Sequence, residues 1–265
     1  MAEVDPNPFA GPVAVPDRAD GTGRSAEPDL IPSTPRVAAY TADAVRAAEA
    51  PLLAAGRPLM REAARALADV AAAELRSVPG AVLVLAGAGD NGGDALFAAA
   101  DLVSSAARVD IVLVRDRVHR EALDAAVATG ARVISVSEAA AGASGYVLVL
   151  DGILGIGRLP DRRLRGSARA LVERLLALPE RPRVIAVDVP SGLDPDDGTA
   201  DAVVLSADVT VTFGALKAGL VRGRGPRLAG RVHLVDLGLD PYLRRAHPAV
   251  TAAIEVVRET PRARA

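Results

Sequence analysis

Short apolar runs alternate with stretches of helical periodicity between residues 81 and 237. The runs are rich in Val, Ile and Leu, which is typical of strands buried on both faces of a parallel sheet. Helical spacing predicts helices over 92–106, 118–129 and 165–178. The alternation predicts an α/β fold with a largely parallel sheet covered on both faces. The predicted strands are AVLVLAG (81–87), RVDIVLV (108–114), RVISV (132–136), GYVLVL (145–150), RVIAVDV (183–189), DVTVTFG (208–214) and RVHLVDL (231–237).

The chain ahead of the first predicted strand reads as a tail followed by two helices. Residues 1–36 hold seven of the nineteen prolines and few large apolar side chains, so a disordered Pro-rich tail is predicted. Thr41 is the expected N-cap of a helix over 41–56, which Pro51 is expected to interrupt. Residues 58–78 show a stronger amphipathic pattern.

One domain is expected over residues 37–245. A short C-terminal extension, 246–265, completes the chain, and its last residues VVRETPRARA are expected to fray. No stretch approaches the ~18 consecutive apolar residues of a membrane span. The N-terminus shows no secretory pattern, so a cytoplasmic location is expected.

Composition removes several classes of protein. A net charge of −2 disfavours a nucleic-acid binder, and the absence of cysteine removes disulfides and thiolate metal sites. Lys217 is the only lysine among many arginines. A buried lysine amine can shift its pKa whereas arginine stays charged, so Lys217 is a candidate for chemistry, although its position could also be incidental.

Carboxylates follow three of the predicted strands, as Asp94, Asp151 and Asp188. Ligands of open α/β sheets bind beyond the carboxyl ends of the strands, so these side chains are expected to share a crevice. A later strand brings Lys217 to the same edge.

The stretch GAGDNG (87–92) matches the dinucleotide fingerprint G-x-G-x-x-G between a strand and a helix. The acid expected at the end of the next strand is ambiguous, because Asp110 and Asp116 both qualify. Asp90 and Asp94 would bring negative charge towards a pyrophosphate, which disfavours an ordinary redox-cofactor loop. Asp94 also has a purely structural explanation as a helix-capping residue.

Two further loops carry candidate ligands. Glycines follow Asp151 in DGILGIG and suit a second phosphate-facing loop, while Asp151 alone could cap a turn. Ser191 has no G-x-S-x-G surroundings and no nearby histidine, so it is expected to be an oxygen ligand and not a nucleophile. Asn91, Asp151 and Ser191 together offer amide, carboxylate and hydroxyl oxygens, which suit a hard cation of low charge.

Over about residues 38–240 the chain resembles the YjeF N-terminal domain family. The resemblance rests on PLMREAA, GAGDNGGDAL, DGILGIG, VIAVDVPSGLDPDDG, ADVTVTFGALKAGL and GRVHLVDLGL, in the order of the family. It implies a three-layer α/β/α Rossmann-like sandwich. It also implies an enzyme that interconverts the R and S epimers of hydrated NADH and NADPH, at C6 of the nicotinamide ring, for a separate ADP- or ATP-dependent dehydratase.

The resemblance also implies residue roles, with no redox cofactor. It places one potassium ion per subunit on Asn91, Asp151 and Ser191, and it implies a homodimer formed through the N-terminal helices. The chain departs from the family's usual residues at Ala64 and Ala95, where glycine is common, and at Asp90, where asparagine is usual. The substrate-binding residues that it implies are Asp90, Asn91, Gly92, Gly93, Asp94, Gly155, Ile156, Gly157, Arg158, Leu159, Pro160, Asp161 and Asp188.

For this reaction Asp188 is the expected acid and base, since one positioned carboxyl can protonate the leaving hydroxyl and then deprotonate the returning water. Lys217 is expected either to orient Asp188 or to neutralise a phosphate. Two other classes stay open. A conventional NAD(P)-dependent oxidoreductase would need a proton relay from only three Tyr, three His and one Lys. A non-catalytic dinucleotide-binding or scaffold module of the same fold would need no chemistry.

Overall fold

The structure, a computed structural model, describes residues 34–261. Their central feature is a sheet of eight strands in the order β11-β9-β7-β6-β5-β2-β3-β4, in which every neighbouring pair is parallel. The strands are β2 (Ala81–Ala86), β3 (Arg108–Leu113), β4 (Arg132–Val133), β5 (Tyr146–Gly152), β6 (Arg183–Val187), β7 (Val209–Phe213), β9 (Arg231–Val235) and β11 (Val256–Glu259).

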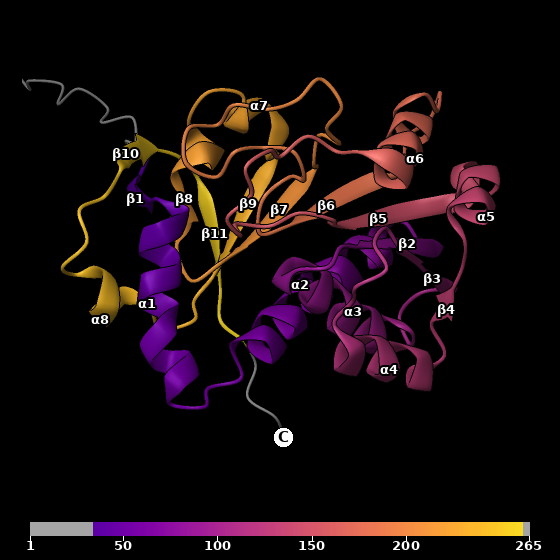
Figure 1. Ribbon diagram of the computed structural model, residues 1–265, viewed down its shortest axis with the longest axis horizontal. Coiled ribbons are helices and arrows are strands. Elements are labelled where there is room, and N and C mark those ends of the chain that lie inside the picture. Colours follow the sequence, from indigo (N-terminus) through magenta and orange to yellow (C-terminus); the bar gives the residue numbers. More distant parts are fainter. Residues whose placement is uncertain (1–33, 262–265) are drawn as a thin grey trace, which may run out of the picture. The chain divides into compact units, whose positions relative to one another are not determined.

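Helices cover both faces of this sheet (Figure 1). Successive residues of β2 show the division, because Val82 and Val84 pack with one set of helices whereas Leu83 and Leu85 pack with the other. The predicted α/β/α sandwich with a parallel sheet is confirmed. One face carries α2 (Leu59–Ser77), α3 (Asp90–Leu102) and α4 (Arg120–Thr129), and the other carries α5 (Val136–Ala141) and α6 (Gly166–Leu176).

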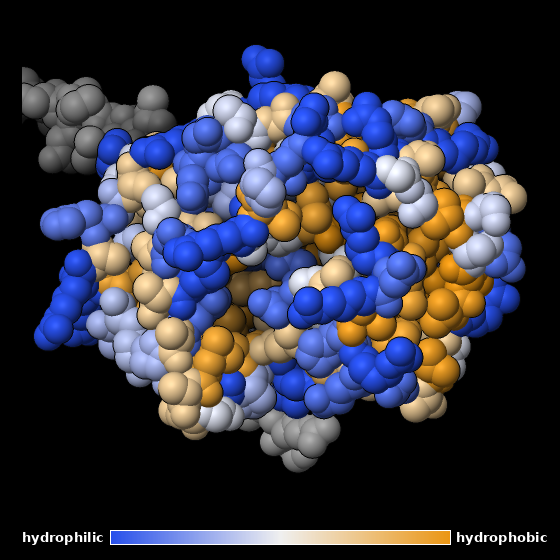
Figure 2. Space-filling model, in the orientation of Figure 1, coloured by the Kyte–Doolittle hydropathy of each residue, from blue (hydrophilic) through white to orange (hydrophobic). Residues whose placement is uncertain are grey.

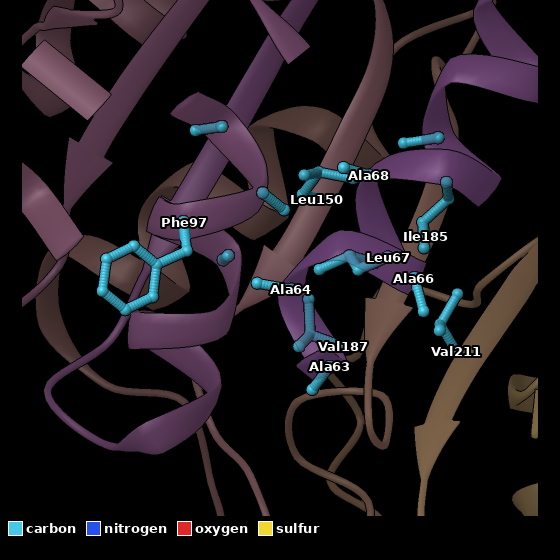
Figure 3. Packing of buried hydrophobic residues seen from close by; sticks show 14 of the residues in the cluster. Ala63, Ala64, Ala66, Leu67, Ala68, Phe97, Leu150, Ile185, Val187 and Val211 are labelled. Atoms are coloured by element: carbon cyan, nitrogen blue, oxygen red, sulfur yellow. The ribbon is translucent and has the colours of Figure 1, made fainter. Parts of the chain in front are cut away.

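Helix α2 presents small side chains to the sheet. Figure 3 shows Ala63 and Leu67 close to Val187, and Ala66 close to Val211. All five side chains are at most 3% exposed. Alanines at these positions let the helix lie close to strands of branched residues. Ala64, where the family commonly has glycine, is buried in the same packed layer.

A second, three-stranded sheet lies beside the first, in the order β10-β1-β8. The sequence did not predict it, because its strands are short and rich in alanine. Its strands are β1 (Arg36–Tyr40), β8 (Leu216–Lys217) and β10 (Val250–Ala253). The remaining elements are α1 (Ala42–Ala54), η1 (Ala143–Gly145), η2 (Ala218–Val221), α7 (Gly225–Leu228) and α8 (Asp240–Leu243).

Three sequence predictions about elements are wrong. Helix α1 continues through Pro51, which lacks an N–H to donate, and ends three residues later at Ala54. The end expected to fray contains β11, which pairs with β9 along Val256–Glu259. The strand expected over 132–136 is only the two residues of β4, since α5 begins at Val136.

Most of the predicted Pro-rich tail, residues 1–33, lies outside the described residues, as do residues 262–265. Arg36, assigned to the tail, is the first residue of β1. Among the helices of residues 34–261, none combines the length and apolarity that crossing a bilayer requires.

Candidate functional site

A cavity of about 530 Å³ opens at the carboxyl ends of the central strands. The loops after β2, β3, β5 and β6 meet there, and α1 closes one side. Figure 2 shows the surface hollowed between α1 and α2, with hydrophilic residues on its left and right sides and hydrophobic residues at its lower edge. The predicted site residues in its wall are Asp90, Asn91, Asp94, Gly155, Ile156, Gly157, Leu159 and Asp188.

The loop after β2 depends on glycine for its close contacts. A Cβ at Gly87 would lie 1.9 Å from the carbonyl oxygen of Ile153, and one at Gly92 would lie 2.1 Å from the carbonyl oxygen of Gly87. A Cβ at Gly93 would meet the sulfur of Met60 at 2.8 Å. Gly92 and Gly93, predicted to bind substrate, therefore pack the start of α3 against its neighbours and do not line the cavity.

Asn91, at the start of α3, contacts both the end of β6 and the loop after β5. Its amide nitrogen donates a hydrogen bond to the carbonyl oxygen of Val187 at the end of β6. Its Oδ1 lies so close to Gly155 that a Cβ there would be only 2.0 Å away. The loop after β5 can approach Asn91 only because residue 155 is glycine.

Asp151 and Ser191 lie behind the cavity wall, and each is 1% exposed. The backbone N–H of Ser191 donates to Oδ2 of Asp151 at 2.9 Å, and Ser191 Oγ accepts from the N–H of Leu154 at 2.9 Å. Burial raises the pKa of Asp151, opposed by the hydrogen bonds from Ser191. Within residues 34–261 no cationic side chain is bonded to this carboxylate.

Asp188 follows β6 and takes a left-handed backbone conformation, with φ of 67°. It is the only non-glycine residue of the described chain with a positive φ. Its Oδ1 accepts hydrogen bonds from Thr212 Oγ1 and the N–H of Phe213, both at 3.1 Å, and from Lys217 Nζ. Such a strained position persists only when its surroundings hold it, and it is characteristic of functional sites.

Lys217 is buried beside this carboxylate. Its side chain is 1% exposed, and Nζ donates to Asp188 and, at 2.7 Å, to the carbonyl oxygen of Phe213. Lys217 does not line the cavity. Of the two roles expected for it, orienting Asp188 fits this position, whereas contact with a phosphate does not.

Asp94 faces the same cavity from the first turns of α3 and is 5% exposed. Burial raises its pKa well above the usual value, and the charges of Asp188, Asp90 and Glu49 raise it further. Glu49, whose pKa burial also raises, comes from α1 and was not predicted. Because α1 does not follow a strand of the eight-stranded sheet, nothing in the sequence placed it beside a crevice at the ends of those strands.

Only part of the predicted loop 155–161 faces the cavity. Its backbone is held by Arg162, which donates to the carbonyl oxygens of Gly155 at 2.7 Å and Gly157 at 2.9 Å. Arg158 points to Asp43 of α1, at 3.2 Å. Asp161 pairs with Arg163 and Arg165, whose hydrogen bonds lower its pKa. Arg158, Pro160 and Asp161 are therefore absent from the lining.

The ambiguous acids of β3 are now placed. Asp110 is 1% exposed inside the sheet and accepts hydrogen bonds from Arg108, Arg132 and Tyr146 at 2.7–2.8 Å. Burial and the hydrogen bond to Asp110 raise the pKa of Tyr146 to about 12. Asp110 is thus part of a structural network. Asp116 is exposed, and neither acid lines the cavity.

A crevice at the carboxyl edge of a parallel sheet, next to a glycine loop, defines a Rossmann-like α/β protein with a site suited to a nucleotide. The family of YjeF-related protein N-termini matches residues 56–219, and the chain belongs to this family.

Named relatives agree with this family. The chain is 86% identical to an NAD(P)H-hydrate epimerase of Microbacterium testaceum (strain StLB037), over 90% of this chain and 93% of the relative. It is 53% identical to one of Clavibacter sepedonicus, over 81% and 95%. It is 42% identical to the bifunctional NAD(P)H-hydrate repair enzyme Nnr of Mycobacterium tuberculosis (strain CDC 1551 / Oshkosh), over 76% of this chain but 41% of that enzyme.

A solved structure supports the fold. The crystal structure of yeast ynu0, YNL200c, superimposes with a TM-score of 0.59 over 69% of this chain and 83% of that one, at 21% identity.

Proposed function

We propose that this chain is an NAD(P)H-hydrate epimerase, which interconverts the R and S forms of hydrated NADH and NADPH at C6 of the nicotinamide ring. The family and the names of its relatives support the activity. The observation that carries the proposal for the site is Asp188, which faces a nucleotide-sized cavity and is held by the chain's only lysine. The chain holds only three tyrosines and three histidines, so it offers few groups for the proton relay of a redox enzyme.

Two carboxyl groups in the wall suit opposite halves of the reaction. Asp94 has a pKa raised by burial and by neighbouring charges, so it is suited to hold and donate a proton. Asp188 has a buried ammonium partner, so it is suited to act as the carboxylate that accepts one. Different environments for two neighbouring carboxyls are a common way to assign acid and base.

The chemistry balances with these two groups. Asp94 protonates the C6 hydroxyl as the C6–O bond breaks, and the lone pair of the ring nitrogen forms an iminium while water leaves. Water then adds to the opposite face of C6, Asp188 takes one of its protons, and the nitrogen regains its lone pair. Proton exchange with water then returns Asp94 to its acid form and Asp188 to its carboxylate form, and no electron acceptor is consumed.

The wild-type protein provides the first test. Incubated with R-enriched hydrated NADH or NADPH, it should bring the two epimers to equilibrium many times faster than buffer, as followed by chromatography. A non-catalytic module would leave the uncatalysed rate unchanged. A conventional oxidoreductase would instead oxidise NADH in the presence of one member of a substrate panel. Either result would contradict the proposal.

One potassium ion per subunit, held by Asn91, Asp151 and Ser191, is the cofactor that we propose. The donor set fits a hard monovalent cation, because the three side chains offer oxygen atoms. Asp151 is buried, and its hydrogen bonds come from Ser191 and the N–H of Ile153 rather than from a cationic side chain. When bound, the ion supplies the positive charge that this carboxylate otherwise lacks. Among residues 34–261, no three His, Asp or Glu side chains gather as they would for a transition metal.

Potassium should therefore stabilise the folded protein. At a concentration 100 times its Kd, it should add about 2.7 kcal/mol to the free energy of unfolding relative to choline chloride of equal ionic strength. Asp151→Asn should abolish this difference, whereas Asp116→Asn, an exposed control outside the cavity, should keep it. Thermal unfolding in the two salts measures it. Equal melting temperatures for the wild type would refute the ion, and a retained shift in Asp151→Asn would refute its ligands.

Three further parts of the proposal concern partners and location. The S hydrate would pass to a separate ADP- or ATP-dependent dehydratase. The bifunctional relative supports a link to a second repair activity in one pathway. We also propose a homodimer formed through the N-terminal helices, and a cytoplasmic location.

A further inference from the structure

Two arginines after β3 line the cavity without a partner. Arg115 and Arg117 are exposed, and within residues 34–261 neither guanidinium makes a hydrogen bond or an ion pair. The N–H of Val114 donates to the carbonyl oxygen of Ala86 at 3.1 Å, which fixes this segment beside the start of the glycine loop. The two cations therefore border the same cavity as the reacting carboxyls.

Charge is unevenly distributed along the cavity wall. Four acids, Asp90, Asp94, Asp188 and Glu49, make the region near β6 and α1 acidic. The third cation of the wall, Arg46, is engaged by Asp43 and by the carbonyl oxygen of Ile156. Arg115 and Arg117 are thus the cations of the described wall that are available to an anionic group of the ligand.

Sheet order separates these regions. Between the strand that carries Asp188 and the strand that precedes Arg115, the order is β6-β5-β2-β3. Three spacings of about 4.8 Å place their ends roughly 14 Å apart. A ligand that reacts beside Asp188 and also reaches Arg115 must be long, with an anionic group far from its reacting ring. A dinucleotide has this shape.

The end of the strand after the glycine loop has a known use in dinucleotide folds. An acid there binds the 2′-hydroxyl of the adenosine ribose, whereas an arginine accommodates a 2′-phosphate. Asp110 is sealed inside the sheet and Asp116 is outside the cavity wall, so neither of these acids lines the cavity at this place. The pyrophosphate, by contrast, would lie at the glycine loop before α3.

We propose that Arg115 and Arg117 bind the 2′-phosphate of the substrate, so that the enzyme favours hydrated NADPH over hydrated NADH. This inference rests on the proposed function and names the substrate within it. Guanidinium groups bind phosphate through paired, charge-assisted hydrogen bonds, and an exposed, unpaired arginine need not break an existing interaction to do so.

The kinetic test compares both substrates in the double variant Arg115→Ala/Arg117→Ala. Its kcat/KM for R-hydrated NADPH should fall by about 10- to 100-fold, the value of one hydrogen bond to a charged group. Its kcat/KM for hydrated NADH should stay within about threefold. Arg120→Ala, a control that removes an exposed charge from α4 outside the cavity, should change neither.

Other outcomes overturn the inference in distinct ways. An equal fall for both hydrates would place the arginines on the pyrophosphate, which the substrates share. No change for either hydrate would show that Arg115 and Arg117 do not contact the substrate.

A binding measurement separates this inference from the proposed function. By calorimetry, the wild type should bind adenosine 2′,5′-bisphosphate at least tenfold more tightly than AMP, and the double variant should bind the two alike. If the wild type epimerises neither hydrate but shows this binding difference, the function fails and the phosphate site stands. Equal binding of the two nucleotides by the wild type overturns the phosphate site.

Discussion

Asp188→Asn should lower the rate of epimer equilibration by about 10²- to 10⁴-fold, the usual contribution of a general acid or base. The substitution should lower the free energy of unfolding, because it leaves the buried Lys217 without its charged partner, but it should keep the backbone conformation for a specific reason. Residue 188 has a φ of 67°, and asparagine is among the few residues other than glycine that accept this left-handed conformation. The amide keeps the shape of the carboxyl and its acceptor oxygen, but it cannot take a proton from water.

The rate is measured by chromatography of the two hydrate epimers, and the fold by circular dichroism. Asp116→Asn serves as the matched control, because it removes a carboxylate from an exposed position outside the cavity. A nearly normal rate in a folded Asp188→Asn protein would rule out this carboxylate as the base. Loss of the fold in Asp188→Asn would be seen in the spectra before any rate is interpreted.

Lys217→Met should lower the free energy of unfolding by about 3–5 kcal/mol, the cost of leaving one buried charge without its partner. Methionine fills much of the same volume, so the loss would come from the carboxylate of Asp188 and not from a cavity. Lys217→Arg should recover only part of this loss, because a larger guanidinium must enter a site where the side chain is 1% exposed.

A double-mutant cycle separates the ion pair from simple packing. Asp188→Asn/Lys217→Met removes both charges, so its loss of stability in urea denaturation should be clearly smaller than the sum of the two single losses. Purely additive losses would show that the two residues do not stabilise each other. If Lys217 positions the base, Lys217→Met, measured under conditions in which it is folded, should lower kcat more than it changes KM.

The central strands of the sheet and their crevice could be predicted because burial on both faces leaves an apolar run in each of them, whereas the edge strands β4 and β11 are not buried in this way and were mispredicted. Of the acids after three of these runs, Asp94 and Asp188 line the crevice as strand polarity predicts, whereas Asp151 is buried behind its wall, so the prediction that all three share the crevice is wrong for Asp151. The short second sheet was missed for the opposite reason. Strands such as β8, with only Leu216 and Lys217, carry too few residues to show any period, and they form because tertiary packing brings them together.

Within the site, the directions of the side chains could not be predicted from the sequence. The motif DGILGIGRLPD marks a loop near the ligand, but local ion pairs decide which of its residues face the cavity. Arg158 turns to Asp43 on a helix more than 100 residues earlier, and no local pattern reveals that contact. Glu49 and the arginines after β3 were overlooked because each looks like an ordinary exposed charge until the fold places it beside the glycine loop.

Burial of the chain's single lysine has a practical consequence for chemical labelling. In the native protein, amine-directed reagents such as acylating esters have no exposed lysine side chain to attack, since Lys217 is shielded from solvent. Acylation at this residue, read by peptide mass spectrometry, would therefore report how often the buried region around Asp188 and Lys217 opens to solvent. The buried lysine is therefore a native probe of local opening, and no labelling site has to be introduced.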